Sequence, residues 1–129
     1  MKTVTAAVIV EEGRLFLARR PAGDPLAGAW ELPGGKVEPW ETAQACLARE
    51  LTEELAMAVE VGRLLATTVY HYEHGSFEIL AYEVTRASDY ITLVHDASAW
   101  VSSTEIAALE LAPADEDLVA QLVDSGVWR

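Results

Sequence analysis

Cysteine and basic residues are both scarce in this sequence of 129 residues. Cys46 is the only cysteine, so no disulfide can form within the chain, and we expect a reducing, cytoplasmic location. Nine Lys and Arg residues stand against 21 Asp and Glu residues, which gives a formal net charge of −12. Because this charge repels a phosphate backbone, we expect no nucleic-acid polymer as a partner.

Long apolar runs are absent as well. The run that follows Met1-Lys2-Thr3 is only about seven residues long, whereas a membrane-spanning helix needs about 20. It ends at Glu11-Glu12-Gly13 and lacks the layout of a signal peptide, so we expect no membrane partner. Since no linker or repeat divides the chain, its length predicts one domain over residues 1–129.

Periodicity and turn residues predict alternating strands and helices. We expect strands over residues 4–10, 14–20, 59–72, 77–84 and 99–101, and helices over residues 42–55 and 116–123, with a brief helix ending near Leu109. The first two strands are expected to pair, and the next two to form an antiparallel hairpin. This order predicts an α/β fold, an α/β/α sandwich with a mixed β-sheet covered on both faces.

Residues 34–57 carry the most distinctive pattern of the chain, a glycine bend followed by a helix. Thr42 is the expected N-cap, and residues 42–55 contain neither Gly nor Pro. The apolar stripe of this helix consists of Leu47, Leu51 and Leu55. Because these leucines recur every four residues, we expect them to face the core.

Three glutamates, Glu50, Glu53 and Glu54, share about one helical turn beside this stripe. Like charges four residues apart destabilise a helix by a few tenths of a kcal/mol, which a cation between them would relieve. Mg²⁺ takes oxygen ligands and keeps waters that substrate phosphates can replace. The three glutamates alone fit either a solvated acidic helix face or a divalent metal site.

The loop and helix together resemble the signature of the Nudix hydrolase family, G-x5-E-x7-R-E-U-x-E-E-x-G-U, where U is aliphatic. The matching residues are Gly35, Glu41, Arg49, Glu50, Leu51, Glu53, Glu54 and Met57. Ala56 stands where the family has glycine. A left-handed residue at a helix end costs Ala roughly 1 kcal/mol more than Gly, so we expect a different helix exit and an intact activity.

The resemblance implies a set of catalytic and metal-binding residues. Glu50, Glu53, Glu54 and the carbonyl of Gly34 would hold Mg²⁺ or Mn²⁺. Glu53 or Glu54 would orient or deprotonate the attacking water, while Arg49 and Glu41 would orient the metal ligands. In several members another acidic residue lies six positions before the residue equivalent to Trp100, where this chain has Val94. That role is open unless His95, Asp96 or another glutamate takes it.

Four further residues are expected to bind the substrate. Arg20 resembles the phosphate-contacting arginine of MutT-type Nudix enzymes, and Lys36 is a second candidate for a phosphate contact. Trp30 or a strand aromatic such as Tyr70 could stack on a base, although strand aromatics more often pair within a sheet. Asp115 fits either an N-cap or, by resemblance to the L-x-P-A-(Asn/Asp) stretch of MutT-type and CTP pyrophosphohydrolase-type enzymes, a contact to the base.

The resemblance implies metal-dependent hydrolysis of nucleoside triphosphates to a monophosphate and diphosphate. CTP, modified cytidine nucleotides and oxidised purine nucleotides are the expected substrates, because an ionised Asp115 would accept from the cytosine amine whereas a protonated one could also donate. Hydrolysis of ADP-ribose or another nucleoside diphosphate derivative is an alternative, and a nucleotide sensor without turnover is another. A monomer and a homodimer are equally compatible with the sequence.

Overall fold

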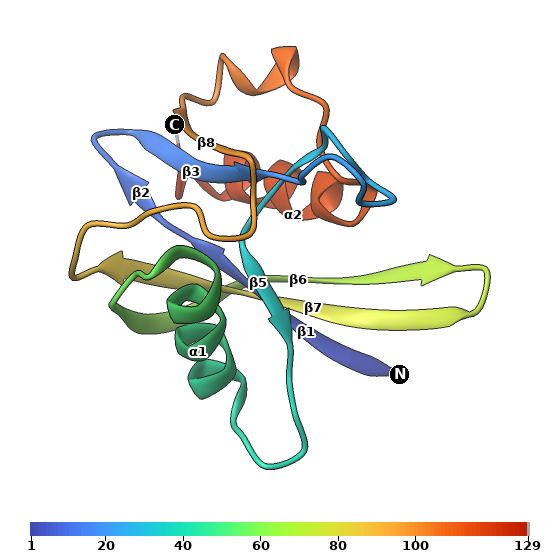
Figure 1. Ribbon diagram of the computed structural model, residues 1–129. Helices are drawn as coiled ribbons and strands as arrows, with labels where there is room; N and C mark the ends of the chain where they lie inside the picture. Colours follow the sequence, from blue (N-terminus) through green and yellow to red (C-terminus); the bar gives the residue numbers. More distant parts are fainter. Residues whose placement is uncertain (129) are drawn as a thin grey trace.

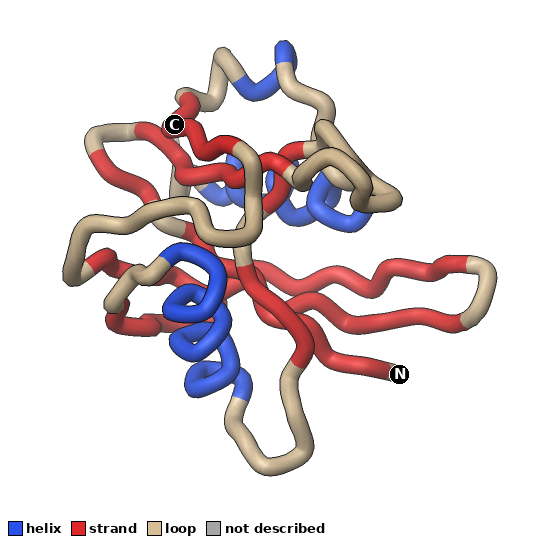
Figure 2. Tube along the Cα trace, in the orientation of Figure 1, coloured by secondary structure: helices blue, strands red, loops and turns tan. Residues whose placement is uncertain are grey.

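Two β-sheets and two long helices make up residues 1–128, the part of the chain that the computed structural model describes (Figures 1 and 2). The strands are β1 (Lys2–Val8), β2 (Val10–Glu11), β3 (Arg14–Arg19), β4 (Trp30–Glu31), β5 (Gly34–Lys36), β6 (Val59–Tyr72), β7 (Gly75–Arg86) and β8 (Ala97–Val101). The helices are α1 (Ala43–Leu55), the 3-10 turn η1 (Ile106–Ala108) and α2 (Pro113–Ser125). In the described part of the chain, none of the helices has the length and apolar character that spanning a membrane requires.

The larger sheet has the order β5-β1-β7-β6 and is mixed, because β1 runs parallel to β7 while the other neighbours are antiparallel. Successive β1 side chains face opposite sides of this sheet. Ala6 and Val8 pack in the core that contains α2, whereas Ala7 lies in the core that contains α1. The predicted sandwich with helices on both faces is therefore confirmed (Figure 1).

The pairing predicted for the first two strands is wrong for most of their length. The chain separates into β1 and β2 near Ile9, and only β2 pairs with β3, through Val10 opposite Leu15 and Glu11 opposite Arg14. β1 is instead bonded to β5 and β7 in the larger sheet. The physical reason is that β1 carries apolar residues on both faces, which are buried only between the two helices.

The predicted hairpin of residues 59–72 and 77–84 is confirmed, with β7 extended to both sides of the predicted range. It projects beyond the end of β5, as Figure 1 shows. Two register shifts between Val61 and Ala66 bend the strand β6. Near the tip, the ring of Phe77 lies 5.6 Å from those of Tyr70 and Tyr72, so these aromatics pair within the hairpin.

The C-terminal helix begins earlier than predicted. α2 starts at Pro113 after Ala112, and Asp115 lies buried within its first turn, so the expectation of Asp115 as the N-cap is wrong. Pro113 explains the earlier start, because proline is favoured at the first position of a helix. Its nitrogen carries no hydrogen, and an amide hydrogen at that position would have no partner within the helix. The brief helix predicted to end near Leu109 is reduced to the single 3-10 turn η1.

The ends of α1 combine a confirmed prediction with a corrected one. The Thr42 hydroxyl accepts a hydrogen bond from the amide of Ala45 at 3.1 Å, as expected for the N-cap. At the other end Ala56 adopts the left-handed conformation, with φ 51° and ψ 34°. The helix thus ends as a glycine would end it, and the different exit expected from the Ala56 substitution is not found. Met57, buried beyond it, packs in the core beside α1 and holds this exit in place.

Candidate active site

A cavity of about 370 Å³ opens beside β1 and β5, and we call it the central cavity. Its wall includes the glycine bend, the start of α2 and the tip-proximal part of the β6–β7 hairpin. The lining residues that matter below are Arg20, Glu31, Lys36, Phe77 and Asp115. Three of the four predicted substrate-binding residues therefore share one cavity, although they lie far apart in the sequence.

The glycine bend joins this cavity to the acidic turn of α1. A Cβ atom at Gly35 would overlap the carboxyl group of Glu50, and one at Gly34 would overlap the carbonyl oxygen of Thr5. Only glycine permits both contacts, since any side chain would displace the bend from β1 and α1. As a result, the floor of the central cavity lies directly against the first glutamate of the predicted metal site.

Arg49 holds three of the predicted catalytic carboxylates together. Its Nη2 and Nε donate to the two oxygens of Glu41 at 2.6 and 3.0 Å, and its Nη1 lies 3.1 Å from Glu50 Oε1 and 3.2 Å from Glu53 Oε2. The hydrogen bonds from Arg49 lower the pKa of Glu41 to about 2. These contacts are compatible with the orienting role predicted for Arg49 and Glu41.

Glu54 is the glutamate with an unpaired buried oxygen. Its Oε2 has no hydrogen-bond partner among the described residues, and burial raises its pKa to about 7. Burial also raises the pKa of Glu50, whereas Glu53 is more open, with 57% of its side chain exposed. A buried carboxylate without a partner is a costly arrangement that a bound cation would relieve.

The oxygen-rich character of this turn fits a hard divalent cation. Within residues 1–128, however, no three acidic, histidine or cysteine side chains converge on one point as a ready metal site. Arg49 instead engages oxygens from Glu50 and Glu53. Glu50 and Glu53 would need other side-chain conformations to share an ion with Glu54.

A second polar network borders the central cavity around Glu31. Arg20 donates through Nη1 to both oxygens of Glu31 at 3.2 and 3.3 Å, and through Nη2 to Asp24 at 2.6 Å. The Nε2 atom of His95 lies 2.8 Å from Glu31 Oε2, and the His95 side chain is buried. Glu31 was not among the residues predicted for the site, and His95 was predicted only as a replacement for an acidic residue.

Asp115 is one of the few buried polar residues, with 7% of its surface exposed. Burial raises its pKa to about 8, and the negative charge of Glu31 adds to this effect. At neutral pH the carboxyl group is therefore mostly protonated and can donate one hydrogen bond as well as accept. It lines the central cavity from the first turn of α2.

Other predicted residues lie outside the central cavity. Trp30 is not among the residues that line it, and its ring lies 5.6 Å from the guanidinium carbon of Arg19. Val94 is 53% exposed in the loop before β8. Asp96 in the same loop forms an ion pair with Arg19 at 2.7 Å.

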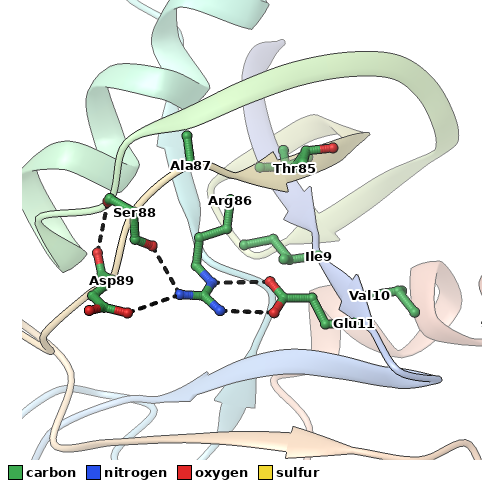
Figure 3. Close-up of a pocket in the computed structure, with 9 residues that line it drawn as sticks. Ile9, Val10, Glu11, Thr85, Arg86, Ala87, Ser88 and Asp89 are labelled. Atoms are coloured by element: carbon green, nitrogen blue, oxygen red, sulfur yellow. Dashed lines mark hydrogen bonds and ion pairs between the residues drawn. The ribbon is translucent and has the colours of Figure 1, made fainter.

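A second cavity of about 450 Å³ surrounds Arg86 (Figure 3). The Arg86 guanidinium donates to both oxygens of Glu11 at 2.8 and 3.0 Å and to the carbonyl of Ser88 at 3.0 Å. The centre of the Tyr90 ring lies 5.3 Å from the guanidinium carbon of Arg86. The Arg86 guanidinium is thus held by acceptors within its own cavity.

A family model described as NUDIX domain matches residues 4–121 of the chain. The chain is 38% identical over 123 residues to the CTP pyrophosphohydrolase of Escherichia coli (strain K12). This alignment covers 92% of the chain and 89% of that relative. It is also 38% identical over 128 residues to a putative 8-oxo-dGTP diphosphatase 2 of Mycobacterium tuberculosis (strain ATCC 25618 / H37Rv). That alignment covers 92% of the chain and 86% of the relative.

Solved structures show the same fold. The solution structure of the E. coli ORF135 protein superposes with a TM-score of 0.87 at 36% identity, covering 96% of this chain and 89% of that one. The crystal structure of a MutT NUDIX hydrolase from Burkholderia pseudomallei gives a TM-score of 0.83 at 27% identity, covering 94% of this chain and 97% of that one. The mixed sheet with its two helices is thus shared with these proteins.

Proposed function

The chain belongs to the Nudix family and is a pyrophosphohydrolase that acts on nucleotides, and we propose that it cleaves nucleoside triphosphates to a monophosphate and diphosphate with the help of a divalent cation. One observation carries this proposal: the acidic turn of α1 and a cavity of nucleotide size meet at Gly35. The polyphosphate would lie toward the bend and the base toward α2. We also propose that residues 1–129 act as one domain.

The proposed metal ligands are Glu50, Glu53, Glu54 and the carbonyl of Gly34. The unpaired buried oxygen of Glu54 and the oxygen-rich turn support Mg²⁺ or Mn²⁺ there. When bound, such an ion neutralises charge on the phosphate oxygens and acidifies water. Arg49, which already contacts Glu50 and Glu53, would keep these carboxylates in a fixed relation.

Removal of a proton from the attacking water is the proposed role of Glu53 or Glu54. A general base works best when its pKa lies near the working pH. The pKa of about 7 for Glu54 meets this condition in the metal-free protein, and a bound cation would lower it. Glu53 is the more exposed of the two and is therefore more open to solvent water.

Arg20 and Lys36 are the proposed phosphate contacts, since both line the central cavity near the glycine bend. The Nε atom of Arg20 is buried without a hydrogen-bond partner among the described residues, so the guanidinium retains capacity for another acceptor. Its planar fork matches the spacing of phosphate oxygens. Phosphate binding would draw this fork partly away from Glu31 and Asp24.

The proposed base contact is Asp115, with Glu31 beside it in the cavity wall. A protonated Asp115 offers a donor and an acceptor, whereas an ionised Glu31 only accepts. Cytosine matches this set, because its 4-amino group donates and its ring N3 accepts. An oxidised purine also matches through its N7–H donor and O6 acceptor. Cytidine nucleotides and oxidised purine nucleotides are therefore the proposed substrates.

The test is a panel of CTP, dCTP, UTP, dGTP, 8-oxo-dGTP and ADP-ribose, assayed with Mg²⁺ and with Mn²⁺. Release of diphosphate from CTP or 8-oxo-dGTP is the expected result, and UTP and dGTP measure how far the site discriminates among bases. Turnover of ADP-ribose alone, which yields no diphosphate, would replace the proposal with a hydrolase of nucleoside diphosphate derivatives. Tight binding without turnover of any nucleotide would identify a sensor.

A further inference from the structure

The loop between β7 and β8 connects the acidic helix to the wall of the central cavity. On one side, the amide of Leu93 donates to the carbonyl of Glu54 at 2.9 Å, at the end of α1. On the other side, the amide of Asp96 donates to the carbonyl of Arg19 at 3.2 Å. His95 lies between these two anchors, so its backbone is fixed relative to both α1 and β3.

The side chain of His95 is buried inward from this loop and is only 2% exposed. Its Nε2 atom bonds Glu31 at 2.8 Å, while its Nδ1 atom is buried without a partner among the described residues. A buried imidazole with one free nitrogen costs stability, which a purely structural residue such as leucine would avoid. The cost indicates that the single bond to Glu31 has a role in function.

We propose that His95 is a positioning residue that holds Glu31 in the wall of the central cavity when nucleotide binds. Glu31 has two partners, Arg20 and His95. The proposed function engages Arg20 with phosphate, which weakens its hold on Glu31. His95 is then the partner that keeps the Glu31 carboxylate directed toward the base.

This inference rests on the proposed function and adds a link between two ends of the site. Because the loop is bonded to the Glu54 carbonyl, the position of Glu31 is tied to the helix that carries the proposed metal ligands. The loop and the His95–Glu31 bond together fix how far Glu31 lies from the acidic turn of α1. A displaced Glu31 would therefore weaken nucleotide binding more than it slows the chemical step.

The test compares His95→Leu with His95→Gln, whose amide nitrogen reaches the position of Nε2. We expect His95→Leu to raise KM for CTP or 8-oxo-dGTP about tenfold, the order expected when a buried carboxylate loses a partner, while kcat changes less than about threefold. His95→Gln should keep KM within about threefold of the wild type, since it retains the donor to Glu31. The matched control is His74→Leu at the exposed hairpin tip, which should leave both constants unchanged.

A double-mutant cycle decides whether His95 acts through Glu31. In a Glu31→Ala background, the further change His95→Leu should alter KM less than about twofold, because position 31 then offers His95 no acceptor. An unchanged KM in His95→Leu, an equally large effect in the Glu31→Ala background, or a loss confined to kcat would overturn the inference. If His95→Leu does not fold, as judged by circular dichroism, His95→Asn replaces it and is expected to raise KM in the same way.

A binding measurement separates failure of this inference from failure of the proposed function. Calorimetric Kd values for CTP and 8-oxo-dGTP, measured in EDTA, should rise about tenfold in His95→Leu and stay near the wild-type value in His95→Gln. A wild-type protein that binds nucleotide but does not hydrolyse it with Mg²⁺ or Mn²⁺ would overturn the proposed function, and the same Kd ratio would still support the role of His95. Equal Kd values for all three proteins would overturn that role alone.

Discussion

Arg49 in α1 pairs with Glu41 in the loop that joins β5 to α1, with Nη2 2.6 Å from Oε1 and Nε 3.0 Å from Oε2. The two parallel hydrogen bonds orient the guanidinium so that its remaining nitrogen reaches Glu50 and Glu53. Lysine has a single charged nitrogen and cannot reproduce this planar fork. The arrangement of the acidic turn therefore depends on arginine itself at position 49.

Replacement of Arg49 by lysine is expected to reduce kcat for nucleotide hydrolysis by about 10- to 100-fold, the range typical of residues that orient metal ligands. The physical reason is that the carboxylates of Glu50 and Glu53 lose their common partner. Steady-state kinetics at saturating Mg²⁺ measures the effect. Arg63→Lys on the exposed side of β6 is the matched control, and a similar kcat for Arg49→Lys and this control would contradict the proposed orienting role.

Replacement of Ala56 by glycine is expected to stabilise the protein by about 1 kcal/mol, because Ala56 adopts a left-handed conformation at φ 51°. Nucleotide hydrolysis should not change, since this residue carries no chemistry. Urea unfolding measures the difference in free energy. Ala45→Gly, at an exposed position within α1, is the control and should destabilise by about 1 kcal/mol. A loss of stability in both variants would count against strain at Ala56.

The buried Asp115 predicts a specific dependence of stability on pH. Its pKa rises from an ordinary value of 3.8 to about 8 in the folded protein, chiefly through burial. The contribution of this group to the free energy of unfolding is therefore fully present below about pH 4. It is lost as the pH rises toward 8, by at most about 1.4 kcal/mol per pH unit. Glu54, with a pKa raised to about 7 by burial, acts in the same direction.

Asp115→Asn should remove the part of this slope that Asp115 contributes and leave the part due to Glu54. Urea unfolding at pH 5, 6, 7 and 8 compares the variant with the wild type. The wild type should lose more stability than the variant between pH 5 and pH 8. Parallel curves for the two proteins would show that Asp115 does not titrate in this range.

Asp115→Ala is expected to change the preference among bases while basal hydrolysis persists. The side chain lies in the wall of the central cavity, separate from the acidic turn, so its removal affects recognition rather than water attack. Loss of one bidentate contact to a base typically costs about 1–3 kcal/mol of discrimination. The ratio of kcat/KM values for CTP and UTP, and for 8-oxo-dGTP and dGTP, measures this. Unchanged ratios would place base recognition elsewhere.

Local patterns predicted α1 well because its determinants lie within one segment of the chain. Leucine at every fourth position marks the buried face, and Thr42 marks the first turn. The family signature also named Glu41 and Arg49 together as orienting residues, and the structure pairs them directly, since both belong to one loop and helix. The same locality explains why the β6–β7 hairpin was predicted in its correct antiparallel form.

Features that depend on distant parts of the chain were missed. β1 pairs with β7 and not with the strand that follows it. Val4 lies opposite Ile79, a residue more than 70 positions away in the sequence. Glu31 and His95 are separated by 64 positions, and no local pattern shows that the loop before β8 brings them together. The left-handed Ala56 was missed because core packing of Met57 overrides a preference of only about 1 kcal/mol.

The most direct test of the account is diphosphate release from CTP and 8-oxo-dGTP by the wild type and by Glu53→Gln, each with Mg²⁺ and with EDTA. Glu60→Gln on the exposed face of β6 serves as the control. We predict that chelation abolishes turnover of the wild type and that Glu53→Gln reduces it about 100-fold or more, with little change in stability. Turnover that persists in EDTA, or that is equal in Glu53→Gln and the wild type, would contradict the assignment of the acidic turn as the catalytic centre.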